Sequence, residues 1–284
     1  MKAVFYTTFA LVAFAFNSIL CRLALKSESI DPVGFTLLRL FSGAFVLGVI
    51  FAIVGKGAGK ELRKKGGNWL SAFFLFSYAI CFSLAYISLA TATGALLLFG
   101  CVQATMLIAA LVSGERPGFA EWIGLVVALG GLVYLVFPGL TAPPLFHSAL
   151  MAAAGVSWGF YTLRGKGLTD PLADTAGNFL RTLPMVGIAA LPFLSAIKLS
   201  QKGVVLAVLS GALASGIGYA VWYAALKFHS ATRAAILQLS VPALASLGGV
   251  ILLAETISWR LFWASVLILG GVGLAIFGRR LKKS

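Results

Sequence analysis

The sequence predicts an all-α integral membrane protein of ten transmembrane helices, arranged as two inverted five-helix repeats. Composition, block length and an internal repeat carry this prediction. Of the 284 residues, 60% are hydrophobic and 11% are charged, whereas a soluble domain carries about 25% charged residues. The apolar residues form blocks of about 20, the length that a helix needs to cross a hydrocarbon layer of ~30 Å. Ten blocks occupy nearly the whole chain, so no separate extramembrane domain is expected.

Short polar, glycine-rich or proline-rich segments separate the apolar blocks. Asp31-Pro32 and Asp170-Pro171 each combine an N-capping carboxylate with a proline, which suits the first turn of a helix. The first block is too long for the apolar region of a signal peptide and lacks a small-residue cleavage site, so we expect a retained span. The expected spans are 3–24, 33–54, 68–89, 93–113, 119–138, 146–164, 174–197, 203–226, 231–253 and 259–278.

The positions of the cations predict the orientation in the membrane. Of the 22 Lys and Arg residues, fifteen fall on the side of the N-terminus and five on the other side. Cytoplasmic loops carry such an excess, so we expect a multi-pass protein of the bacterial inner membrane with both termini in the cytoplasm. The net charge of +14 follows from these loops, which face anionic lipid, and does not indicate nucleic acid.

The residues that usually carry metal, redox or acid–base chemistry do not cluster in the spans. All three cysteines lie inside apolar blocks without a CxxC motif, which favours small buried side chains over a disulfide or metal site. Both histidines lie at span ends, and none of the eight carboxylates falls near the middle of a span. We therefore expect no metal, no cofactor and no enzymatic activity, and no proton coupling through a buried carboxylate.

The two halves of the sequence, 1–140 and 145–284, match at an offset of roughly 140 residues. Each half holds five spans, an odd number, so the second must lie in the membrane in the opposite orientation. Inverted repeats recur in transporters, which bind substrate near the midplane where the repeats meet. Matched features are Glu115 with Glu255, Gly130-Gly131 with Gly270-Gly271, Arg39 with Arg181, and Tyr86 with Tyr223.

The repeated segments resemble the EamA repeat of the drug/metabolite transporter superfamily. The similarity lies in Gly114-Glu115-Arg116-Pro117, in Trp122-Ile-Gly and in the paired glycines of each half, and also in Trp158-Gly159, Pro242 and Glu255. This resemblance spans nearly the whole chain and implies ten helices and metabolite export; within the superfamily, the chain resembles the branch that exports aromatic amino acids. Phe16-Asn17 stands where the family often has Trp-Gly, and Val102 where it has Pro, which leaves the substrate open.

Uncharged polar and aromatic residues deep in the spans are the candidates for substrate contact. An amide in lipid must find a partner, so such amides face protein or a watery cavity. Trp158 is expected to meet Phe16-Asn17 across the repeat interface. Pro184 and Pro242 offer kinks for gating. The predicted substrate-binding residues are Asn17, Tyr78, Phe99, Gln103, Trp158, Tyr161, Tyr219 and Gln238.

Other polar residues in the spans favour structural roles. Arg39 and Arg181 are the deepest charges; either can face a substrate carboxylate, but their matched positions favour bonds to backbone carbonyls or extension to the interface. Tyr86 and Tyr223, near span ends, are typical of an interfacial aromatic belt. Glu115 and Glu255 are expected to cap helices.

Together these features predict a secondary transporter that exports a small metabolite, an aromatic or other neutral amino acid, by alternating access through a central uncharged aromatic-lined cavity. The alternative is a channel or facilitative pore for small solutes. The expected partners are the small-molecule substrate and the lipid bilayer. The sequence does not fix the oligomeric state, and a monomer is compatible with it.

Overall fold

The computed structural model describes residues 2–54, 66–112, 119–137, 142–165, 170–229, 237–238 and 240–281, and within these ranges each expected span overlaps a helix or a run of consecutive helical segments. The helices are α1 (Lys2–Lys26), α2 (Pro32–Val54), α4 (Trp69–Ala85), α5 (Thr91–Val112), α6 (Phe119–Val136), α7 (Leu145–Arg164), α8 (Pro171–Ala190), α9 (Gln201–Leu209), α10 (Gly218–Leu226), α12 (Ser240–Leu253) and α13 (Trp259–Leu281). A 3₁₀ helix, η1 (Leu191–Ala196), extends α8, and a π-helical segment, η2 (Ser210–Ile217), joins α9 to α10.

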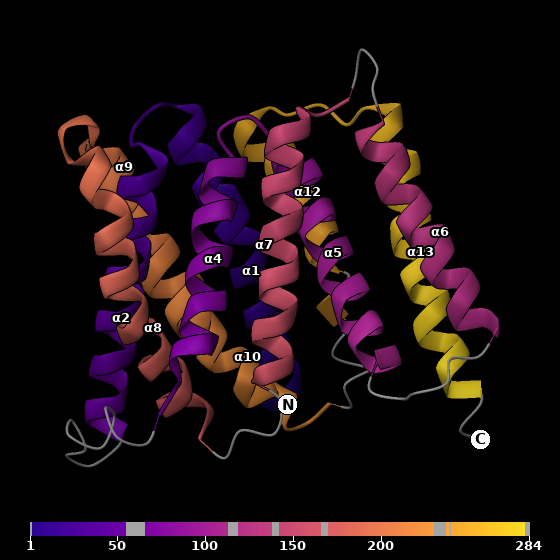
Figure 1. Ribbon diagram of the computed structural model, residues 1–284, viewed down its shortest axis with the longest axis horizontal. Helices are drawn as coiled ribbons and strands as arrows, with labels where there is room; N and C mark the ends of the chain where they lie inside the picture. The colour runs from indigo at the N-terminus through magenta and orange to yellow at the C-terminus, as the bar shows by residue number, and fades with distance from the viewer. Residues whose placement is uncertain are drawn as a thin grey trace.

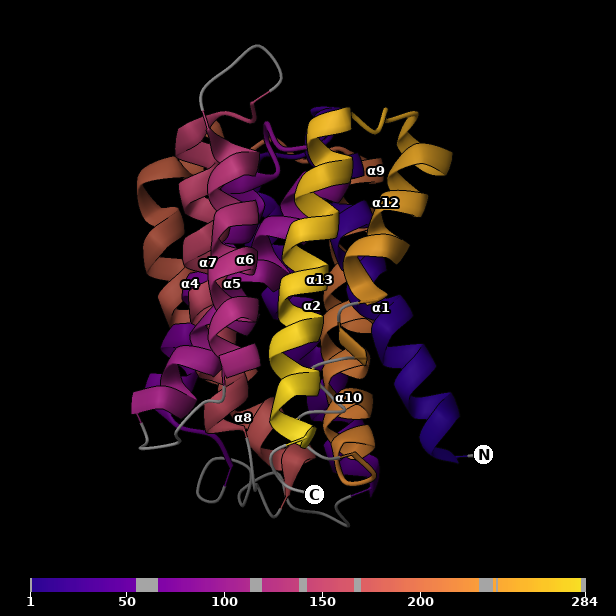
Figure 2. The same cartoon turned by 90° about the vertical axis from the view of Figure 1, so that its right-hand side faces the viewer.

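Five of the described helical segments are long and apolar enough to cross a membrane by themselves, and the chain is a multi-pass helical protein in which these segments are joined by shorter apolar helices. The five are 2–26, 32–53, 91–109, 171–196 and 201–226. The start of α1 and the end of α13 lie on the same side of the bundle (Figures 1 and 2). This placement agrees with an even number of crossings.

The two Asp-Pro dipeptides begin helices as predicted. The Asp31 carboxylate accepts a hydrogen bond of 2.8 Å from the Gly34 N–H at the start of α2. The Asp170 carboxylate accepts one of 3.1 Å from the Ala173 N–H at the start of α8. Each bond satisfies a backbone donor that has no partner inside its helix, so these signals fix where the second span of each half starts.

The helices of the two halves alternate in the bundle, because α1 packs on α10 and α12 while α7 packs on α4 and α5. The second helices of the halves, α2 and α8, pack on each other. The fifth helices, α6 and α13, also form a close pair, which stands at one edge of the bundle (Figure 1). The helices α1 and α7 carry polar and aromatic side chains that line a central cavity.

The assignment of Tyr86 and Tyr223 to an interfacial belt is wrong. Tyr86 is fully buried and its hydroxyl donates to the Thr91 carbonyl at 3.3 Å. Tyr223 is also buried. Each ring lies against a glycine backbone, since an added Cβ would come within 2.5 Å of the Tyr86 ring at Gly94 and 2.7 Å of the Tyr223 ring at Gly165. Both tyrosines therefore fill the interior near opposite ends of the bundle.

Candidate functional site

A small cavity lies among buried side chains of the bundle. Its volume is about 10 Å³, which is room for about one water molecule. Five helices build the wall, and all of its side chains are buried. The wall consists of Phe14, Asn17 and Ser18 of α1, Tyr78 and Phe82 of α4, Leu98 and Phe99 of α5, Trp158 of α7 and Tyr219 of α10.

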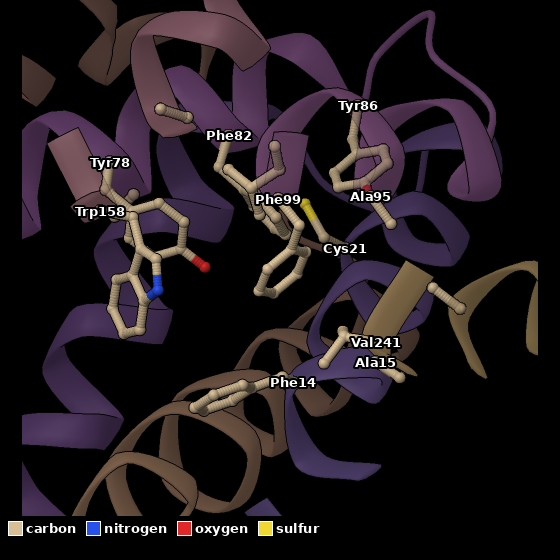
Figure 3. Packing of buried hydrophobic residues seen from close by; sticks show 14 of the residues in the cluster. Phe14, Ala15, Cys21, Tyr78, Phe82, Tyr86, Ala95, Phe99, Trp158 and Val241 are labelled. Carbon is tan, nitrogen blue, oxygen red and sulfur yellow. The ribbon is translucent and has the colours of Figure 1, made fainter. Parts of the chain in front are cut away.

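Trp158 is the centre of the aromatic part of this wall. Its ring centroid lies 4.7 Å from that of Tyr219 and 4.9 Å from that of Tyr78. Phe14 meets the indole edge-on at 6.0 Å. Figure 3 shows Trp158 against Tyr78, with Phe99 and Phe14 on other sides of the same space. The cavity therefore offers flat apolar faces, which suit a ring or an alkyl group.

Asn17 forms a polar edge of the cavity. Its Nδ2 donates to the Tyr78 hydroxyl at 3.2 Å, and its Oδ1 accepts from the Ser210 hydroxyl at 2.5 Å. Both halves of the amide are thus satisfied, as a buried amide requires. Of the pair Phe16-Asn17 expected to meet Trp158, Asn17 lines the same cavity as the indole. Phe16 does not, because it is 45% exposed, and Phe14 contacts the indole instead.

Arg39 lies directly behind the cavity wall, a position that its place in the sequence does not predict. Its guanidinium Nη2 donates to the hydroxyls of Tyr78 at 3.0 Å and Tyr219 at 3.1 Å. Its Nε donates to the Ser215 hydroxyl at 3.0 Å, and Cζ lies 5.0 Å from the centroid of the Phe82 ring. Arg39 is 1% exposed, so the expectation that it bonds backbone carbonyls or reaches an interface is wrong. The side chains that line this cavity are uncharged, but the Arg39 guanidinium contacts two of them from behind.

Arg181, the sequence counterpart of Arg39, has the structural role expected of it. Its Nη1 donates to the carbonyls of Gly66 at 2.7 Å and Gly177 at 2.8 Å. The sequence alone shows that Arg39 is the deepest charge of the first half. It also shows that the hydroxyls of Tyr78 and Tyr219 lie deep in their spans. Such groups must find each other in an apolar bundle, and this signal could have joined Arg39 to the site.

The cavity wall includes five of the eight predicted substrate-binding residues: Asn17, Tyr78, Phe99, Trp158 and Tyr219. The other three lie elsewhere. Tyr161 packs on Trp158 with ring centroids 5.5 Å apart but lines a second cavity. Gln103 and Gln238 are buried outside the wall. Pro184 lies exposed inside α8, and Pro242 lies buried near the start of α12.

A polar cluster, here named the Arg164 cluster, joins the halves on the side of the bundle where α1 begins. Arg164 donates to the Ser71 hydroxyl at 2.9 Å and to the Asn68 side-chain oxygen at 3.1 Å. The Asn178 side-chain oxygen accepts from the Asn68 N–H at 2.9 Å. Side chains of this cluster surround the second cavity, also of about 10 Å³, which Tyr223 lines as well. The cluster ties α7 and α8 to the start of α4.

A second polar cluster, the Arg22 cluster, joins the halves on the opposite side. Arg22 Nε lies 3.4 Å from a carboxylate oxygen of Glu255. Its Nη1 donates to the carbonyls of Tyr86 at 2.9 Å and Ile87 at 2.8 Å. The other Glu255 oxygen accepts from the Thr91 N–H at 2.8 Å. This bond caps α5 and confirms the capping role predicted for Glu255.

Comparisons with known proteins assign the family. An uncharacterised protein of Pseudomonas aeruginosa is 49% identical over 98% of this chain and 96% of its own length. A Salmonella typhimurium protein named a probable amino-acid metabolite efflux pump is 26% identical over 63% of this chain and 65% of its length. A solved crystal structure, 22% identical, covers 96% of this chain and 99% of its own with a TM-score of 0.65, and shares the fold. The sequence model of the EamA-like transporter family matches residues 1–137 and again 146–277. The chain therefore belongs to the EamA-like transporter family.

Proposed function

We propose that this protein is a secondary transporter that exports a neutral amino acid, with an aromatic or other apolar side chain, across the bacterial inner membrane. The observation that carries the proposal is the central cavity. Aromatic faces from Phe14, Tyr78, Phe99, Trp158 and Tyr219 converge there beside the Asn17 amide. Such a wall suits a solute with an apolar side chain and a few polar atoms. The name of the Salmonella relative supports the amino-acid class.

We propose that the two halves form an inverted repeat about this cavity. Three features support it: the family model matches twice, each half holds five expected spans, and corresponding helices pack reciprocally. Both halves contribute to the wall, α1, α4 and α5 from the first and α7 and α10 from the second. In this arrangement the halves rock about the site.

The transport cycle that we propose opens the two polar clusters in turn. The Arg22 cluster and the Arg164 cluster both join the first half to the second, at opposite ends of the bundle. The central cavity holds about one water molecule, so a whole amino acid enters only when helices separate. Breaking one cluster while the other stays closed gives access from one side at a time. This feature favours a carrier over a permanently open channel.

Counterflow in proteoliposomes tests the proposed function. Vesicles preloaded with unlabelled L-phenylalanine, L-tryptophan, L-leucine or L-lysine are diluted into a trace of the same labelled amino acid. We expect transient accumulation for the aromatic and branched amino acids and none for lysine, because the described cavity wall carries no carboxylate that would pair with a second ammonium.

Two outcomes would contradict the proposal. Rapid equilibration without trans-stimulation would identify a channel. Absence of flux for every amino acid in the panel, with protein that elutes as a single species on size exclusion, would show that amino acids are not the substrate. Empty vesicles and vesicles that contain an unrelated membrane protein provide the background rate.

A further inference from the structure

Arg39 is a buried cation for which the described part of the chain provides no anion. Within that part, the ion pair joins Arg22 and Glu255 at the end of the bundle, whereas the hydrogen-bond partners of Arg39 are three hydroxyls. Its Nη1 is fully buried and has no hydrogen-bond partner among the described residues. The guanidinium thus keeps its full charge and at least one free donor in the centre of the protein.

Burying the charge of an arginine in this position is energetically costly, so an arginine kept there usually has a function. A charged side chain in the membrane interior costs at least about 2.5–3.5 kcal/mol and marks substrate or ion pathways. Hydroxyl groups and the ring faces of Tyr78 and Phe82, 5.1 and 5.0 Å from Cζ, solvate the charge but do not neutralise it. Among the described residues, no carboxylate pairs with this guanidinium.

We propose that Arg39 binds the carboxylate of the transported substrate, and that the substrate class is therefore carboxylic acids bearing an aromatic or branched apolar group. This inference rests on the proposed function and deepens it. Tyr78 and Tyr219 belong both to the cavity wall and to the Arg39 hydrogen-bond set. A carboxylate that enters the cavity reaches Nη2 by displacing one of these hydroxyls. Nη1 supplies the second donor of a bidentate pair.

The same geometry ranks the groups of an amino acid by their importance. The carboxylate meets a full positive charge, whereas the ammonium meets ring faces and the Asn17 side-chain oxygen, which already accepts from Ser210. The described cavity wall contains no carboxylate that would pair with the ammonium. The carboxylate is therefore required for binding, and the amino group is dispensable.

Matched acid and amide pairs test this ranking on the unaltered protein. Competition with labelled amino-acid counterflow, and thermal stabilisation of the purified protein, are measured for 3-phenylpropanoate against 3-phenylpropanamide, indole-3-propanoate against its amide, and 4-methylpentanoate against its amide. Each pair keeps the shape and removes the negative charge. We expect each acid to bind at least about tenfold more tightly than its amide, since losing a hydrogen bond to a charged group is worth that much or more.

Variants then locate the effect. Arg39→Gln is expected to bring the acid-to-amide ratio to about one, and Arg39→Lys to retain part of the preference because it keeps the charge but not the bidentate geometry. Arg181→Gln is the matched control, since Arg181 bonds backbone carbonyls away from the cavity; its ratio should equal that of the unaltered protein. If Arg39→Gln does not fold, Arg39→Lys takes its place: a reduced acid-to-amide ratio supports the role of Arg39, and a ratio equal to that of the unaltered protein refutes it.

The outcomes separate the two proposals. If amino-acid counterflow is observed but the protein binds acids no more tightly than amides, the role of Arg39 is refuted. The proposed transport function is then unaffected. Absence of both counterflow and stabilisation for every compound overturns the proposed function, and the role of Arg39 with it. An acid preference that persists in Arg39→Gln shows that another group binds the carboxylate, and also refutes the inference.

Discussion

The paired glycines of α13 provide a stringent test of the helix packing. An added Cβ at Gly271 would lie 2.6 Å from the backbone nitrogen of Ala128 and 2.7 Å from the carbonyl oxygen of Gly124 in α6. At the adjacent Gly270 it would meet nothing within 4 Å. Gly271→Ala and Gly270→Ala therefore make the same chemical change on two different faces of one helix, about 100° apart, and only the first is obstructed by backbone.

The expected magnitude follows from this geometry. Ordinary contacts of a Cβ begin near 3.4 Å, so α6 and α13 must separate by about 1 Å, which forfeits a quarter to a half of the dispersion energy across the contact. Overpacking of this kind costs about 1–3 kcal/mol. Alanine also gains about 1 kcal/mol of helix propensity over glycine. Both variants share that gain, so their difference isolates the steric cost of about 1–3 kcal/mol.

The assay is thermal unfolding of both purified variants in the same detergent, followed by tryptophan fluorescence and by loss of the monodisperse peak on size exclusion. We expect Gly271→Ala to unfold about 2–10 °C below Gly270→Ala. Gly131→Ala against Gly130→Ala in α6 repeats the test from the other helix, since an added Cβ at Gly131 meets Leu267 and Ile268. Equal unfolding temperatures within both pairs would refute the close α6–α13 contact.

Three further predictions follow. A reporter that is active only outside the cytoplasm, fused after Ser284, should be silent, because the cation count predicts that both termini lie inside; activity there would contradict this predicted orientation. An imposed pH gradient should change the rate of transport less than about twofold. The described cavity wall carries no carboxylate or histidine, and intramembrane proton relays use such groups. Strong stimulation that an uncoupler abolishes would reveal a proton site. Trp158→Ala should lower counterflow at least about tenfold through loss of the central aromatic face, whereas Trp263→Ala, at a side chain 52% exposed on α13, should not; equal effects would make Trp158 a packing residue.

The sequence predicted the helices because the bilayer requires long apolar blocks. It predicted two of the helix starts because capping depends on neighbouring residues. A helix needs about 20 apolar residues to span the hydrocarbon, so apolar blocks mark the spans without knowledge of tertiary contacts. Asp31 and Asp170 fixed two helix starts through purely local hydrogen bonds. The depth of a residue in its span could likewise be read from the sequence. Depth was enough to place Tyr78, Tyr219 and Trp158 in the central cavity.

What the sequence could not predict is the face of the helix from which a side chain points. Apolar residues occur on every side of α1, so no amphipathic period distinguishes its inner face from its outer one. Phe14 and Phe16 are equivalent in composition and depth, yet Phe14 meets Trp158 while Phe16 is exposed. The same ambiguity placed Tyr86 at an interface and left Arg39 outside the site. These assignments depend on contacts between helices that are distant in sequence.

The small volume of the central cavity has a consequence for the membrane as a whole. Space for about one water molecule cannot hold the unbroken file of waters through which protons and small ions leak. A carrier with so small a central cavity is expected to leave the electrochemical gradients of its membrane intact while it is in this form. The aromatic side chains proposed to contact the substrate would then also block the passage of water and ions. A cell could therefore keep the protein in its membrane during periods when nothing is exported.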